Sequence, residues 1–462
     1  MSTFFDLIAH RIFGNKSTIL LLTIVLLPTI AISLLGRYYA SHLEGVAPID
    51  LTNLAAIRTV AKSIFSTHQL GDSWYPMRDA LEFMRSGSNA HLYETLFFQK
   101  TVRFQYPPSS LLPLELLSSL GLSSVGSLNK LNLLFYFLNA AAMGFLAWLL
   151  CRAGHDDTRT SKFVNLQLDS KVLVPLSVIA SLAFYPVLRA QVLGQIQVWI
   201  DLLFTLAIIF WVGGRQLVSG VCIGLACAIK PQLGLLLVWG LLWRRVNFVL
   251  GISMAIVPIL LISVARYGWQ TYLGYLEVLS FLSKHGESFF ANNSINGILN
   301  SYFSPSNPHV WDASTLTPYV PIVYAGTVVA EVFAVALIAI PPLVCRLKSP
   351  SVETIGTAAI CTVIGSPVAW EHHYGILLPL YLVAVRGTVA LPPGCRRLVL
   401  LAALAVSWIL VANLIPFVLL LGETPLRALQ AQCFFGALLL LIVLFVLQAP
   451  LLRASKLQRE PT

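Results

Sequence analysis

Apolar runs of about 20 residues recur along the chain from Ser17 to Pro450, and they limit the fold more than any other feature. A helix needs a run of this length to cross the hydrocarbon core of a bilayer. Only 11% of the residues are charged, against about 25% in a soluble globular protein. Short strands of alternating polarity, which are typical of a membrane β-barrel, do not appear. The sequence therefore predicts an all-α polytopic membrane protein and excludes an ordinary soluble enzyme, a disordered chain and a disulfide-stapled secreted domain.

The apolar runs predict about twelve membrane spans, within a range of about ten to thirteen. They lie at 17–36, 131–150, 172–190, 196–213, 215–229, 231–243, 247–265, 321–345, 353–368, 373–391, 398–421 and 430–449. With both termini inside, the short basic turns and the basic tail fall on one side, as the positive-inside rule requires. This layout holds if 109–125 does not cross the membrane or if 215–243 is a single span. The second option places 151–171 outside.

The net charge of +10 comes mostly from lysines and arginines in short loops between apolar runs, so it indicates membrane topology and no nucleic-acid partner. We expect one membrane-embedded domain covering 1–462. Two of its segments are not spans. They are an extracytoplasmic first loop at 37–108 and a second extracytoplasmic loop at 266–320, which is polar and aromatic. The protein is thus expected to be a multi-pass protein of the cytoplasmic membrane.

The first loop carries two amphipathic patterns. Apolar residues recur every three or four positions at Leu51, Leu54, Ile57, Ala61, Ile64 and Phe65, which predicts a helix lying on the membrane surface. A second, shorter amphipathic helix is predicted from Trp74 to Arg85. The loop is therefore expected to lie against the bilayer surface.

Polar groups near the apolar core of a membrane protein usually serve a function. Those of this chain are Asp72, Tyr106-Pro107-Pro108, Gly194-Gln195, Lys230-Pro231, Asn292-Asn293-Ser294 with Asn296-Gly297, and Ser366-Pro367 with Trp370-Glu371-His372-His373. On the twelve-span layout all of them fall at or near the outside face. They therefore predict one outward-facing polar site close to the bilayer surface.

The chemistry of such a site is limited by what the sequence lacks. No Walker A sequence, no GxGxxG and no zinc-ligand spacing is present, so we expect neither a nucleotide cofactor nor a metal. What remains is a lone carboxylate, cations, a histidine pair and amides. One carboxylate is enough as general base when the leaving group is a phosphate, whereas ordinary glycosidases need two. Lys230, Arg103 and the histidines are candidates for stabilising the departing phosphate.

The order of these motifs resembles glycosyltransferase family 87, the polyprenol-phosphate-mannose-dependent mannosyltransferases of the GT-C superfamily. The most specific piece is Ser366-Pro367 with Trp370-Glu371-His372-His373, which is close to the family's SP-x-x-W-x-H-H. The resemblance covers about residues 70–390. It implies a GT-C-type fold and transfer of a sugar, with inversion, from a polyprenyl phosphate to an acceptor hydroxyl of a glycolipid or glycan in the cell envelope.

Carried onto this sequence, the resemblance implies that Asp72 is the catalytic base and that His372 or His373 assists near the donor phosphate or the acceptor. The substrate-binding candidates are Lys230, Arg103, Tyr106, Gln195, Asn293 and Trp370. The sequence departs from the family where Ser73-Trp74 follows Asp72 in place of the common Phe, which leaves Asp79 and Glu82 as rivals for the base.

Structural roles remain open for the same residues. Asp72 can cap a helix, Lys230 can extend from a helix end to the bilayer surface, and Gln195 and Asn293 can join helices by hydrogen bonds. Two further functions also remain open. One is a transferase that uses a polyprenyl-phosphate arabinose or another pentose, and the other is a transporter or flippase of lipid-linked sugars.

Overall fold

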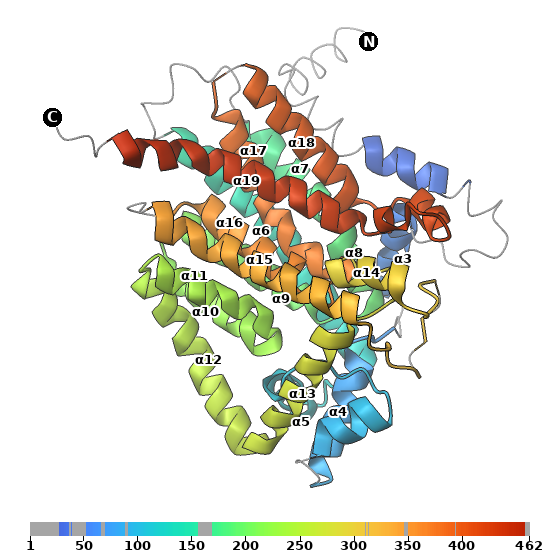
Figure 1. Ribbon diagram of the computed structural model, residues 1–462. Helices are drawn as coiled ribbons and strands as arrows, with labels where there is room; N and C mark the ends of the chain where they lie inside the picture. The colour runs from blue at the N-terminus through green and yellow to red at the C-terminus, as the bar shows by residue number, and fades with distance from the viewer. Residues whose placement is uncertain are drawn as a thin grey trace.

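The structure is a computed structural model, and it describes residues 27–36, 38, 52–65, 70–87, 91–155, 169–309, 311–312, 314–345, 350–392 and 394–457. Every regular element in these ranges is helical (Figure 1). The only β-type pairing among them is an isolated bridge between Asn292 and Trp370. The all-α prediction is therefore confirmed for the described residues.

The helices fall into three groups by length. The long ones are α6 (Val125–His155), α12 (Val246–Tyr267), α15 (Pro321–Cys345), α18 (Cys395–Ala412) and α19 (Gln432–Leu457). Those of intermediate length are α3 (Asn53–Phe65), α4 (Trp74–Arg85), α7 (Ser170–Ala183), α9 (Gln197–Val212), α10 (Gln216–Ile229), α13 (Trp269–His285), α16 (Val352–Ile364) and α17 (Leu378–Val389). The short ones are α5 (Leu111–Ser119), α8 (Tyr185–Leu193), α11 (Leu235–Leu242) and α14 (Ile295–Phe303), with the π-helix η2 (Glu94–Gln99) and the 3₁₀ helices η3 (Pro108–Ser110), η4 (Pro231–Gly234), η5 (Glu371–Leu377), η6 (Pro416–Leu421) and η7 (Arg427–Gln430).

Several of these helices indicate a membrane protein. Within the described residues, four are long and apolar enough to cross a membrane, namely Val125–Arg152, Val246–Tyr267, Pro321–Leu343 and Cys395–Ala412. A fifth span arises if α7 and α8, which meet at a 46° bend, are counted together. The predicted count of about twelve is therefore not confirmed.

The difference arises because apolar runs continue through helix breaks. The run at 215–243 is divided into α10, η4 and α11, and α10 has only 14 residues. At about 1.5 Å per residue such a helix is about 21 Å long, shorter than the hydrocarbon core of about 30 Å. The segment 109–125 contains the end of η3, the nine-residue α5 and the first residue of α6, so its one complete helix is about 14 Å long and too short to cross alone.

The amphipathic helix predicted from Trp74 to Arg85 is confirmed, because α4 has these bounds and buries Met77, Leu81 and Met84. The surface helix predicted around 51–65 forms as α3, although its Phe65 end is 92% exposed. Leu51 lies outside the described residues.

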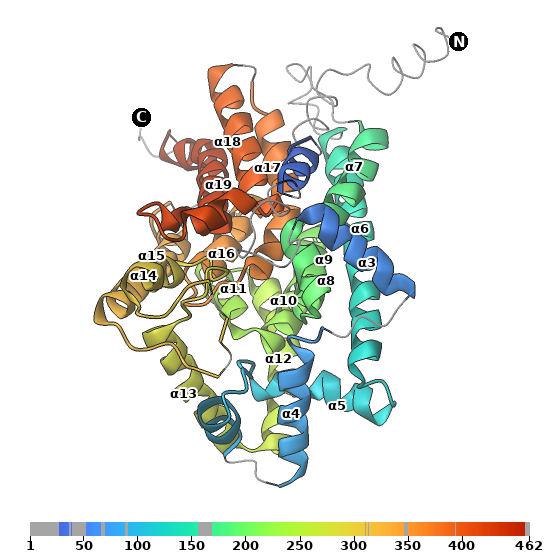
Figure 2. The same cartoon turned by 90° about the vertical axis from the view of Figure 1, so that its right-hand side faces the viewer.

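The two segments expected as outside loops pack on one another. In both views α4, α5 and α13 gather at one end of the molecule, opposite α7, α17 and α18 (Figures 1 and 2). Tyr93, just before η2, contacts Tyr275 of α13 with ring centroids 5.6 Å apart. Phe97 of η2 contacts Phe281 of the same helix in an edge-to-face pair at 5.8 Å. The second segment is itself helical, since it contains α13 and α14.

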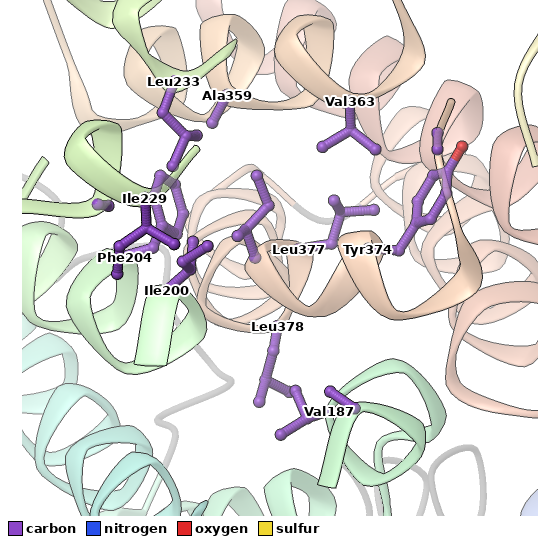
Figure 3. Packing of buried hydrophobic residues seen from close by; sticks show 14 of the residues in the cluster. Val187, Ile200, Phe204, Ile229, Leu233, Ala359, Val363, Tyr374, Leu377 and Leu378 are labelled. Carbon is purple, nitrogen blue, oxygen red and sulfur yellow. The ribbon is translucent and has the colours of Figure 1, made fainter. Parts of the chain in front are cut away.

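The helix η5 lies in the middle of the apolar core. Figure 3 shows its Tyr374 and Leu377, with Leu378 directly after it, among side chains of α8, α9, η4 and α16. All seven residues of η5 are buried. The histidine pair therefore belongs to the part of the fold that is most firmly held by packing.

Candidate active site

Asp72 lies directly before α4, where the chain passes the end of α8. Its backbone N–H donates to the Leu193 carbonyl at 3.0 Å, and the Gln195 side-chain amide donates to Asp72 Oδ2 at 2.7 Å. Among the described residues, none donates a hydrogen bond to Asp72 Oδ1, and the residue is exposed. The protein thus holds one carboxylate oxygen and leaves the other open to a substrate.

This close approach depends on Gly194, which ends α8 in the left-handed conformation with φ of 70°. A Cβ atom at this position would lie 2.3 Å from the Leu70 carbonyl oxygen and 2.8 Å from Asn129 Oδ1. Asn129 in turn donates to Leu70 O at 2.8 Å. Because no side chain fits here, glycine lets the segment before Asp72 lie directly on the end of α8.

Ser73, Tyr106 and Gln195 form a hydroxyl–amide cluster beside Asp72. Ser73 Oγ donates to Gln195 Oε1 at 2.6 Å and lies 2.8 Å from Tyr106 Oη. It also accepts the Ile196 backbone N–H at 3.0 Å. Tyr106 Oη is 3.2 Å from the same Gln195 oxygen. The cluster fixes the amide so that its N–H group points at Asp72.

We expect Ser73→Ala to destabilise the protein by about 1–3 kcal/mol, because Ser73 is buried and the Ile196 N–H loses its acceptor. Release of Gln195 should also lower the catalytic rate about tenfold. Thermal unfolding in detergent, together with an activity assay, measures both effects. Ser86→Ala at the exposed end of the same helix is the control and should change neither. Unchanged unfolding and rate in Ser73→Ala would show that the cluster does not position Gln195.

The two rival carboxylates, Asp79 and Glu82, lie on the exposed face of α4. That helix buries the opposite face, made of Trp74, Met77, Ala80, Leu81 and Met84. Among the described residues, neither carboxylate has a hydrogen bond to the hydroxyl–amide cluster. The geometry thus favours Asp72 over both.

Lys230 lies between α10 and η4 and belongs to a second polar group. Its Nζ donates to Gln197 Oε1 at 2.7 Å, and Gln197 Nε2 donates to Asp201 Oδ1 at 2.8 Å. Asp201 packs on Gly375 of η5, where an added Cβ would lie 2.2 Å from Asp201 Oδ2. This buried group therefore links α9 to the helix that carries the histidines.

The amide motif and the Ser-Pro motif pair with each other, although 75 residues separate Asn292 from Pro367. Asn292 Oδ1 accepts the Ala369 N–H at 2.9 Å, and Asn292 Nδ2 donates to Pro367 O at 3.2 Å. The Asn293 N–H donates to Ala369 O at 2.8 Å. These bonds fix the backbone that leads into η5.

Asn293 is fully buried, and both ends of its side chain are used inside the protein. Its Oδ1 accepts the Cys433 N–H at 3.0 Å, and its Nδ2 donates to Ala291 O at 3.1 Å. These contacts are structural. Its predicted role in substrate binding stays a prediction.

His372 and His373 are the second and third residues of η5, and their rings are 4.7 Å apart and nearly perpendicular. The charge of Lys230 acts on both rings. His373 Nδ1 is buried and has no hydrogen-bond partner among the described residues.

Trp370 belongs to an aromatic cluster with Trp311 and Phe289. The Trp370 and Trp311 rings are 5.5 Å apart, as are those of Phe289 and Trp311. The Arg103 guanidinium lies 5.8 Å from the Trp311 ring centre and donates to the Thr315 carbonyl. Arg103 thus ties the first loop to the second.

Burial and nearby charges shift the pKa values of ionisable groups outside the membrane spans. Although Asp72 as a residue is exposed, the protein atoms around its carboxyl group keep part of the water away, and this desolvation raises the pKa of the carboxyl. The Gln195 hydrogen bond and the Arg189 charge oppose this rise. Burial likewise raises the pKa of the Tyr106 hydroxyl, so it stays a hydrogen-bond donor. The pKa of the Arg103 guanidinium is lowered by burial, against the raising effect of Glu287 and Asp312.

Sequence reasoning missed the part that α8 plays. Tyr185, its first residue, donates to Glu371 Oε2 at 2.9 Å, while its last residue accepts the Asp72 N–H. Arg189 lies between them. The missed signal is a single charged residue within an otherwise apolar run at 172–190.

A helical membrane protein that sets an open carboxylate beside an amide and two hydroxyl groups has the features of a membrane enzyme. The sequence model of glycosyltransferase family 87 matches residues 104–369, more than half of the chain, so the chain belongs to this family. The protein is therefore a glycosyltransferase, and its all-helical fold is consistent with the GT-C superfamily. No curated protein matches the chain. The matched residues include Tyr106, Gln195, Lys230 and Asn293, whereas Asp72, Trp370 and the histidine pair lie outside them.

Proposed function

We propose that the protein is an inverting transferase that moves mannose from a polyprenyl phosphate to an acceptor hydroxyl on a glycolipid or glycan. The active site lies at the extracytoplasmic face of the cytoplasmic membrane. The observation that carries this proposal is the carboxylate of Asp72, which is held through Oδ2 by Gln195 while Oδ1 stays open. One positioned carboxylate suffices for a transfer whose leaving group is a phosphate.

In the proposed step, Asp72 takes the proton of the acceptor hydroxyl while the acceptor oxygen forms a bond to the anomeric carbon. The bond from that carbon to the phosphate oxygen breaks, and the electron pair leaves with the phosphate. Attack from the face opposite the leaving group inverts the anomeric configuration. The products are the glycosylated acceptor and free polyprenyl phosphate, which needs no proton from the protein.

The remaining candidates hold the substrates. Lys230, Arg103 and one of His372 and His373 stabilise the phosphate charge. Gln195 and Tyr106 position polar groups of the sugar, and Trp370 packs against its apolar face. The edge-to-face contact of Trp311 with Trp370, at an interplanar angle of 76°, supports this last role because it holds the Trp370 indole in one orientation. Asn293 supports the site indirectly, because its side chain binds two backbone groups inside the protein and holds them in place. We expect no metal or other cofactor to be required.

The test uses the purified protein in detergent with polyprenyl-phosphate-linked mannose and, separately, arabinose. A crude membrane-lipid extract serves as acceptor, and release of free polyprenyl phosphate is followed. Release from the mannose donor supports the proposal. Release from the arabinose donor alone makes the enzyme a pentosyltransferase, and movement of intact lipid-linked sugar across a bilayer without release makes it a flippase.

The activity should fall as the pH falls through a pKa higher than the ordinary aspartate value of about 3.9, because the base must be ionised and burial raises its pKa. The acid limb of kcat/KM against pH measures this. Asp79→Asn is the control and should leave the pKa of the acid limb unchanged. A limb at or below the ordinary value would contradict Asp72 as the base.

A further inference from the structure

Arg189 is a charged side chain in the middle of α8 that the proposed mechanism does not use. It lies four residues after Tyr185 and four before Leu193, so all three share one face of the helix. Tyr185 binds Glu371 and Leu193 binds the backbone of Asp72. This face therefore runs from the Trp370-Glu371-His372 segment to the carboxylate of Asp72, with Arg189 midway.

The charge of Arg189 acts on both ends of this face. It interacts with the carboxylates of Asp72 and Glu371 and with the His372 ring. Arg189 nevertheless makes no ion pair within the described part of the chain, and its buried Nε has no hydrogen-bond partner there. A half-buried guanidinium without a partner is costly unless an anion binds it.

The other two candidate cations have partners of their own. Lys230 donates to Gln197, which in turn donates to Asp201. Arg103 donates to Thr315 O and lies over Trp311. Arg189 differs from both, because its side chain makes no hydrogen bond or ion pair to any described residue, so all of its donors remain for a ligand. The phosphate must lie close to the base, since the sugar carbon under attack is bonded directly to it.

We propose that Arg189 binds the phosphate of the lipid-linked donor and then holds the same phosphate in the released polyprenyl phosphate. This inference rests on the proposed function. A guanidinium suits the task because its planar set of N–H donors can contact two phosphate oxygens at once. The position on α8 places that charge between the base and the histidine pair.

The test measures binding of polyprenyl phosphate to the purified protein, with no acceptor present. We expect Arg189→Gln to weaken binding about tenfold to hundredfold, and Arg189→Lys to recover part of the affinity because the charge remains. Arg78→Gln, an exposed arginine of α4, is the matched control and should bind like the wild type. If inorganic phosphate displaces polyprenyl phosphate equally well from the wild type and from Arg189→Gln, Arg189 does not contact the phosphate.

Thermal unfolding separates folding defects from loss of a contact. If Arg189→Gln unfolds early, comparison of the wild type with a folded Arg189→Lys decides the question. If the wild type and the folded Arg189 variants bind polyprenyl phosphate with equal affinity, this inference is wrong and the proposed function is unaffected. The same conclusion holds if the variants change the pH profile of the activity. Failure of the wild type to bind polyprenyl phosphate overturns the proposed function itself.

Discussion

Asp72→Asn is expected to lower the rate of polyprenyl-phosphate release by about a thousandfold, the largest effect of any single substitution in the site. General-base catalysis contributes about 10²- to 10⁴-fold to such reactions. Asparagine has the size of aspartate, and its Oδ1 can still accept the hydrogen bond from Gln195. The protein should therefore fold normally, bind polyprenyl phosphate like the wild type and lose only kcat.

Asp79→Asn and Glu82→Gln are the matched controls, because both change a carboxylate on the exposed face of the same helix. Each should keep at least half of the wild-type rate. A slow Asp79 or Glu82 variant beside an active Asp72→Asn would move the base along α4 and would contradict the assignment made here.

Gly194→Ala is expected to have the second largest effect. An alanine at φ of 70° costs about 1–2 kcal/mol, and its Cβ would lie 2.3 Å from the Leu70 carbonyl oxygen. Relief of the clash has to push the Leu70–Ser73 segment away from α8, which costs about 1–3 kcal/mol more. We expect a lower unfolding temperature and a transfer rate reduced by about a hundredfold, because Asp72 loses its place beside Gln195.

Gly214→Ala separates the backbone strain of a positive φ from the clash of a Cβ atom with the Leu70 carbonyl. Gly214 also has a positive φ, 76°, but nothing lies within 4 Å of a Cβ added there, and it follows α9 in a turn. It should therefore lower the unfolding temperature modestly and leave the rate of the folded enzyme intact. Equal effects of both substitutions on the rate would show that the contact at Gly194 does not position Asp72.

The sequence identified much of the candidate site because its polar residues stand out in an apolar chain. Asp72, Tyr106 and Gln195 were singled out for their polarity, and the structure joins them through one hydrogen-bonded cluster. The sequence could not show that Ser73 completes the cluster, because serine is common in loops. Arg189 was missed because it lies inside an apolar run.

The roles of the amides were also beyond the sequence. A buried asparagine can bind a substrate or a backbone, and only its neighbours decide between these roles. Asn293 binds the Cys433 N–H, which is 140 positions away in the chain, and the Ala291 carbonyl, which is two positions away.

Composition, local periodicity and motif order are enough to predict the helical membrane class, the amphipathic helix at Trp74–Arg85 and the family. None of these requires knowledge of distant contacts. The length of each helix, the pairing of the motifs and the unpaired Nε of Arg189 follow only from the three-dimensional fold. These features depend on where each helix ends and on contacts such as that of Tyr185 with Glu371, which joins residues 186 positions apart.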